Sequence, residues 1–115
     1  MGRPDEYSPA IQVPFSEIKA DNYIDIQASV RYLPGEDLGY DAVLLILTAE
    51  HGGKTISYNK TDLETRASGQ DIKEATLEIR VAPEFPPGSV MNLYVWNKDR
   101  KKLWIESLEI SARGY

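Results

Sequence analysis

Residues 88–110 read GSVMNLYVWNKDRKKLWIESLEI, two apolar segments separated by a short basic turn. Each segment carries one tryptophan, and Trp96 and Trp104 lie at equal distances from Arg100 in the turn. A three-residue loop over 99–101 would place the two tryptophans opposite each other, and a two-residue turn would make them diagonal neighbours. We therefore expect an antiparallel all-β domain that closes with this hairpin.

The rest of the chain repeats the strand pattern. Residues 23–33 alternate apolar and polar side chains, and residues 41–50 are apolar on both faces in their middle, which is typical of a central strand. Pro14 cannot donate a ladder hydrogen bond, so a strand over residues 11–15 belongs at a sheet edge. Shorter strands are expected at 55–59 and 74–81, with a turn at 51–53 and a long surface loop over 61–71.

The last strand changes phase along its length. Leu103 and Ile105 share one phase of the alternation, and Leu108 and Ile110 share the other. One extra residue near positions 106–107, a β-bulge, would restore a single inward face. With about seven strands, the sequence predicts an antiparallel two-sheet β-sandwich of jelly-roll or immunoglobulin-like topology. We take residues 1–9 as a flexible lead-in and residues 10–115 as one domain.

Composition excludes several classes of function. The 115 residues suffice for one domain with its own core, and the absence of cysteine excludes disulfides and thiol catalysis. A net charge of −5 argues against nucleic acid as a partner. The longest apolar run, residues 42–47, is far shorter than a membrane span, so we expect no membrane insertion.

The titratable residues give little support to catalysis. The one histidine, His51, lies in a glycine turn, where a surface position is the usual one. Glu106 and Glu109 are three residues apart, so in a regular strand they point to opposite faces and do not form a glycosidase pair. We expect no enzyme and no cofactor. A structural calcium ion is a possible addition, with Glu17, Asp21 and Glu106 as oxygen ligands.

The aromatic residues are the best functional lead. Carbohydrate recognition needs flat rings that stack on sugar faces, together with amide, carboxylate and guanidinium groups that bind the hydroxyls. If Met91, Leu93 and Val95 form the core face of their strand, the rings of Tyr94 and Trp96 point outward. The predicted ligand-binding residues are Trp96, Trp104 and Tyr94 with Asn97 and Arg100. In the competing interpretation, these rings are core or cross-strand pairs.

A resemblance supports the same interpretation. The segments YVWN (94–97) and LWIESLEI (103–110) are similar to the end of small β-sandwich domains of Bacteroidetes proteins. Residues 22–32 and 86–90 resemble an early strand and a turn of the same domains. The chain also resembles galactose-binding-like jelly rolls, many of which are carbohydrate-binding modules. Where those domains carry an aspartate pair, this chain has Glu106-Ser107.

What the resemblance implies is an exported, non-catalytic accessory domain, periplasmic, secreted or on the cell surface, within a longer polypeptide. We expect a binding module with carbohydrate as its ligand. The alternative is a structural or protein-interaction domain with no small-molecule ligand.

Overall fold

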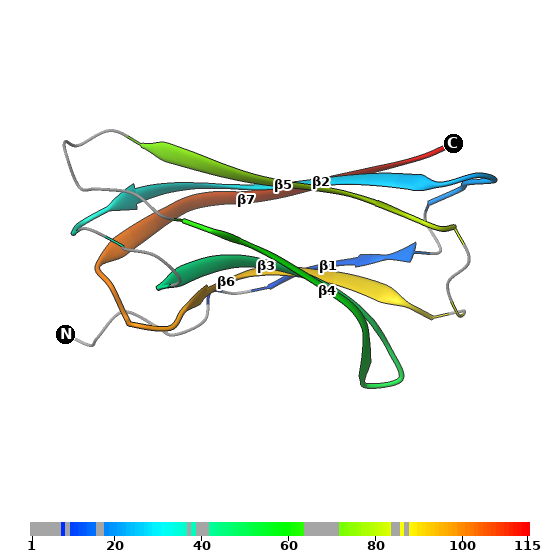
Figure 1. The fold of residues 1–115 in the computed structure, drawn as a ribbon, viewed down its shortest axis with the longest axis horizontal. Coiled ribbons are helices and arrows are strands. Elements are labelled where there is room, and N and C mark those ends of the chain that lie inside the picture. The colour runs from blue at the N-terminus through cyan, green and yellow to red at the C-terminus, as the bar shows by residue number, and fades with distance from the viewer. Residues whose placement is uncertain are drawn as a thin grey trace.

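The computed structural model describes residues 8, 10–15, 18–36, 38, 42–63, 72–83, 86 and 88–115. These residues form two layers of antiparallel strands, which confirms the predicted sandwich (Figure 1). The strands are β1 (Ile11–Pro14), β2 (Ile24–Pro34), β3 (Val43–His51), β4 (Lys54–Asp62), β5 (Lys73–Val81), β6 (Val90–Asn97) and β7 (Leu103–Gly114). One sheet has the order β1-β6-β3-β4 and the other the order β5-β2-β7.

The connections between strands alternate between the two sheets. Among the seven described strands, only β3 and β4 are both consecutive and paired, so five of the six connections cross from one sheet to the other. In an immunoglobulin fold the last strand would pair with β6, whereas here β7 pairs with β2. The strand order therefore differs from that of an immunoglobulin fold, and the sandwich has four strands in one sheet and three in the other.

This topology corrects the hairpin predicted for residues 88–110. β6 and β7 lie in different sheets, and the basic turn between them carries the chain across the end of the sandwich (Figure 1). Trp96 lies opposite Leu44 of β3, and Trp104 lies opposite Leu33 of β2. The prediction that the two tryptophans face each other across a hairpin was wrong, because a short turn can join two sheets as well as two paired strands.

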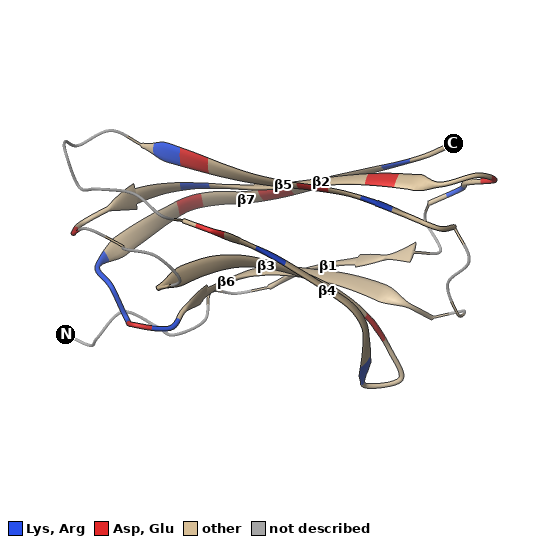
Figure 2. Cartoon of the chain, in the orientation of Figure 1, with Lys and Arg blue, Asp and Glu red and all other residues tan. Residues whose placement is uncertain are grey.

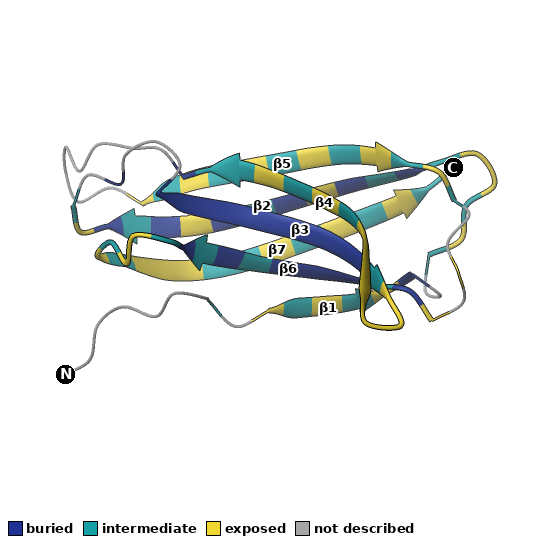
Figure 3. Ribbon diagram, turned by 60° about the horizontal axis from the view of Figure 1, so that its bottom comes forward, coloured by how far each residue is buried: buried dark blue, intermediate teal, exposed yellow. Residues whose placement is uncertain are grey.

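Other local predictions are confirmed. β1 is an edge strand, and β3 is an interior strand that is buried from Val43 to Ala49 (Figure 3). The β3–β4 turn uses Gly52 and Gly53, whose φ values of 59° and 81° favour glycine. The bulge is present as well, because Ser107 pairs with Arg31 while Ile105 pairs with Tyr32, which leaves Glu106 as the extra residue.

One loop prediction was wrong in part. Thr61 and Asp62 continue β4, and Leu63 is buried with 1% of its surface exposed. The remainder of the predicted loop, residues 64–71, lies outside the described residues.

Alternating side chains from both sheets fill the interior. On β2 every second residue from Ile24 to Pro34 is buried, and the residues between them face the solvent. On β6 the inward residues are Met91, Leu93 and Val95, as the sequence predicted. The facing strands are β5 and β4, β2 and β3, and β7 and β6, so none of the other described strands lies squarely opposite β1.

Candidate functional site

The predicted ligand-binding aromatic residues lie on two different faces of the molecule. Because Leu93 and Val95 point into the core, Tyr94 and Trp96 point outward from the four-stranded sheet. Trp104 lies on the outer face of the three-stranded sheet, since its neighbour Leu103 packs against the core. The structure therefore does not bring the three rings together in one site.

Asn97 and Arg100 belong to the turn between β6 and β7. Asn97 is only 3% exposed, and its side-chain amide donates to the carbonyl of Lys101 and accepts from the Lys101 N–H, each at 2.8 Å. Arg100 adopts a φ of 50°, and its N–H donates to the Asn97 carbonyl at 3.2 Å. These contacts give Asn97 a structural role in holding the turn.

The outer face of the four-stranded sheet is unusually well buried. Leu44 and Ile46 lie in the outward phase of β3, opposite Trp96 and Tyr94 of β6, yet they are only 2% and 0% exposed. The Lys98 ammonium lies 5.3 Å from the centre of the Trp96 ring. The two largest hollows described below are lined chiefly by the three-stranded sheet and not by this face.

Trp104 lies on an exposed part of the opposite face. Its side chain is 64% exposed, and one ring atom lies 3.0 Å from where a Cβ on Gly35 would stand. The ring thus packs on a residue without a side chain and keeps its other face open to solvent.

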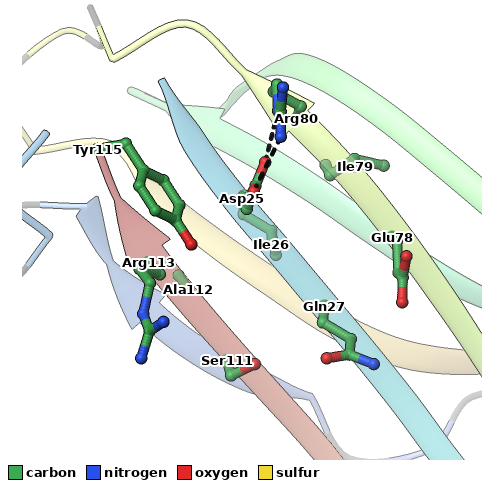
Figure 4. A pocket seen from close by; sticks show the side chains of 10 residues that line it. All are labelled: Asp25, Ile26, Gln27, Glu78, Ile79, Arg80, Ser111, Ala112, Arg113 and Tyr115. Atoms are coloured by element: carbon green, nitrogen blue, oxygen red, sulfur yellow. Dashed lines mark hydrogen bonds and ion pairs between the residues drawn. The ribbon is translucent and has the colours of Figure 1, made fainter. Parts of the chain in front are cut away.

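The clearest hollow lies farther along the same face of the three-stranded sheet (Figure 4). It is a groove of about 640 Å³, within the range of small-ligand sites. Each strand contributes two outward polar residues, and Tyr115 stands at one end of the groove (Figure 4). The polar residues are Asp25 and Gln27 of β2, Glu78 and Arg80 of β5, and Ser111 and Arg113 of β7.

Register explains why these residues meet. Asp25 pairs with Arg80 on one side and Arg113 on the other, and Gln27 pairs with Glu78 and with Ser111. Two adjacent rows of three polar side chains are therefore set side by side, at the spacing of neighbouring strands.

A cluster of fixed side chains forms the Tyr115 end of the groove. Arg80 donates to both carboxylate oxygens of Asp25, from Nε at 2.7 Å and from Nη2 at 3.2 Å. Its guanidinium lies 4.0 Å from the centre of the Tyr23 ring, and the Tyr23 and Tyr115 rings are 4.9 Å apart. The hydrogen bonds from Arg80 lower the pKa of Asp25, which keeps that carboxylate ionised and unsuited to act as a general acid.

The charges in the groove cancel. Charged residues lie along β2, β5 and β7, while β1 and β6 carry none (Figure 2). Within the groove, two carboxylates, Asp25 and Glu78, stand beside two guanidinium groups, Arg80 and Arg113. The site is thus rich in hydrogen-bonding groups but has no net charge to select an anion or a cation.

A second hollow of about 630 Å³ continues the groove toward Trp104 and shares Gln27 and Ser111 with it. It adds Ser29, Thr76, Glu74 and Glu109 of the same face, so its lining holds two carboxylates and no basic side chain. From Tyr115 to Trp104, this face forms one polar strip roughly 30 Å long with an exposed ring at each end.

The predicted calcium ligands are not brought together. Asp21 lies beside the end of β7, where its N–H donates to the Tyr115 carbonyl at 2.8 Å. Glu106 lies at the bulge near the other end of β7 and forms an ion pair with Arg31 at 3.6 Å. Glu17 lies outside the described residues. Among the residues that the structure describes, no group of three histidines or carboxylates could hold a metal ion.

The groove residues were missed because the sequence shows them as ordinary alternation. Asp25, Gln27, Glu78 and Arg80 read as the solvent faces of two strands. The available signal was the variety of hydrogen-bonding groups on these faces, but only the pairing of β2 with both β5 and β7 sets them side by side.

Comparisons with known proteins add no family. No protein-family model, curated protein or solved structure matches the chain. Within the described part of the chain, no helix could span a membrane.

Proposed function

We propose that this domain is a non-catalytic carbohydrate-binding module and that the polar strip on the three-stranded sheet is its binding surface. The observation that carries the proposal is the groove itself, in which amide, hydroxyl, carboxylate and guanidinium groups line about 640 Å³ with no net charge. Neutral polyhydroxylated ligands are bound by such mixed donors and acceptors.

The shape of the strip favours a chain over a single sugar. The two hollows share Gln27 and Ser111, so a ligand in one continues into the other. The exposed rings of Tyr115 and Trp104 at its ends are suited to stack on sugar units. We therefore propose a linear polysaccharide lying along β7. The resemblance to exported accessory domains agrees with such a ligand.

The state of Asp25 supports the proposed non-catalytic role. A retaining or inverting glycosidase needs one carboxyl group that can donate a proton. Asp25 is committed to Arg80 by two hydrogen bonds that lower its pKa, so the groove lacks a suitable acid at this position.

Affinity electrophoresis in gels that contain soluble polysaccharides tests the proposal. We expect at least one neutral polysaccharide to retard the wild-type protein and to shift the NMR signals of β2, β5 and β7. Gln27→Ala and Tyr115→Ala should each weaken the retardation, whereas Tyr58→Ala, which removes a 49% exposed ring from the other sheet, should not. Absence of retardation across a broad panel, or shifts confined to β3, β4 and β6, would contradict the proposal.

A further inference from the structure

The two sheets have unequal widths, and the difference leaves a space one strand wide. The four-stranded sheet extends past the three-stranded one by β1, and no other strand in the described part of the chain lies opposite β1. On the other sheet, β7 pairs with β2 along one side only. Of the described strands, none occupies the position beside β7 and above β1.

The walls of this space are suited to a strand. Ile11 and Val13 of β1 are half-buried and face it from below, and the second hollow reaches it, since Ile11 lines that hollow together with Leu108 and Ile110 of β7. Residues 107–114 of β7 pair with β2 in unbroken register and contain no proline. Their free side therefore presents a regular row of backbone donors and acceptors, with apolar side chains below it.

Because β1 extends beyond the edge of the three-stranded sheet, it limits what can bind beside β7. If a second copy paired its own β7 with this edge, its β6, which lies beneath its β7, would collide with β1 of the first copy. A single extended segment has no second layer and avoids that collision. The space thus selects an isolated strand over the edge of another sandwich.

Charge indicates the sequence of such a strand. Glu109 and Arg113 lie on the outer face of β7 at exposed positions, and neither has an ion-pair partner among the described residues. The Arg113 side chain extends to the side of β7 away from β2 (Figure 4). An antiparallel strand would place an acidic residue opposite Arg113 and a basic residue four positions later opposite Glu109. Between these charged residues, apolar side chains at the second and fourth positions would lie opposite Ala112 and Ile110 and face β1.

We propose that the free edge of β7 binds an extended segment of another polypeptide, with the pattern acidic–apolar–polar–apolar–basic, by adding it as an eighth strand. The segment completes the three-stranded sheet and covers β1. This inference does not require the proposed carbohydrate function, because backbone pairing takes place at the edge of β7, although Glu109 and Arg113 also line the two hollows of the polar strip.

The test uses a synthetic peptide with the central sequence EVTVK and a matched control, KVTVE, with the two charges exchanged. We expect the first peptide to bind with a Kd between roughly 10 and 500 µM and the control to bind about tenfold more weakly. The protein variant E109R/R113E should reverse this preference, while Lys60→Glu, at an exposed position on β4 of the other sheet, should leave it unchanged. Equal binding of both peptides, or no binding of either, would overturn the proposal.

Hydrogen exchange identifies the occupant. In the free protein, alternate amides between Ser107 and Arg113 should exchange rapidly and become protected when the EVTVK peptide binds. Protection of these amides in the free monomer would show that the chain's own residues fill the space and would overturn the proposal. Dimerisation that E109R/R113E alters would identify a second copy as the occupant and would also overturn it.

Discussion

Replacement of Asn97 by alanine separates a structural role from a ligand role. The side-chain amide of Asn97 forms two hydrogen bonds of 2.8 Å to the backbone of Lys101, and the residue is 3% exposed. A hydrogen bond of this kind contributes roughly 0.5–1.5 kcal/mol net, so Asn97→Ala should lower the free energy of unfolding by about 2 kcal/mol. For a domain of this size, the midpoint of thermal unfolding should fall by roughly 10 °C.

Urea unfolding followed by tryptophan fluorescence measures this loss. The m-value should stay unchanged, because the folded and unfolded states keep their exposed areas. Asn22→Ala is the matched control, since Asn22 is an exposed asparagine outside the turn and should cost less than about 0.5 kcal/mol. A loss of polysaccharide binding by Asn97→Ala without a loss of stability would refute the reasoning and restore Asn97 as a ligand-binding residue.

Three further substitutions test the fold. Because Arg80 lowers the pKa of Asp25, the ion pair between them should stabilise the fold at neutral pH, and this stabilisation should disappear as the pH falls below about 4. Asp25→Asn should remove this part of the pH dependence of the unfolding free energy, as measured by urea titrations at several pH values. Leu93→Ala, at a core position with 0% exposure, should cost about 2–5 kcal/mol by urea unfolding, and a cost below 1 kcal/mol would contradict its placement. Gly53→Ala meets no atom within 4 Å, so its cost should be the backbone strain at a φ of 81° alone, about 1 kcal/mol by thermal unfolding.

The sequence predicted strands well because burial repeats every second residue. The alternation in β2, the apolar run in β3 and the change of phase at Glu106 each report a local environment, and each is confirmed. Pairing between strands was harder to predict. β6 already has β1 and β3 as neighbours, so β7 has no free side of β6 to join, and no local pattern in residues 88–110 reveals this.

The candidate site was even harder to predict than the strand pairing, because it too depends on which strands are neighbours. A groove made by three strands depends on which strands are neighbours, and β7 reaches β2 from a distance of about eighty residues. The sequence analysis predicted Trp104 as a ligand-binding residue, but it placed Trp104 in the same site as Trp96 because it expected a hairpin between their strands. Gln27 and Ser111 were passed over, because a polar residue on an exposed strand face carries no local sign of its neighbours.

The alternation of connections between the two sheets has a consequence for how the chain acquires its structure. Almost every pairing joins distant parts of the chain, so an early nucleus is limited to the β3–β4 hairpin and most native contacts must wait. The central strand β2 lacks one of its two neighbours until β7 has left the ribosome. We therefore expect the domain to complete its fold only after β7 has been synthesised and to fold slowly, because most of its strand pairs are far apart in the chain.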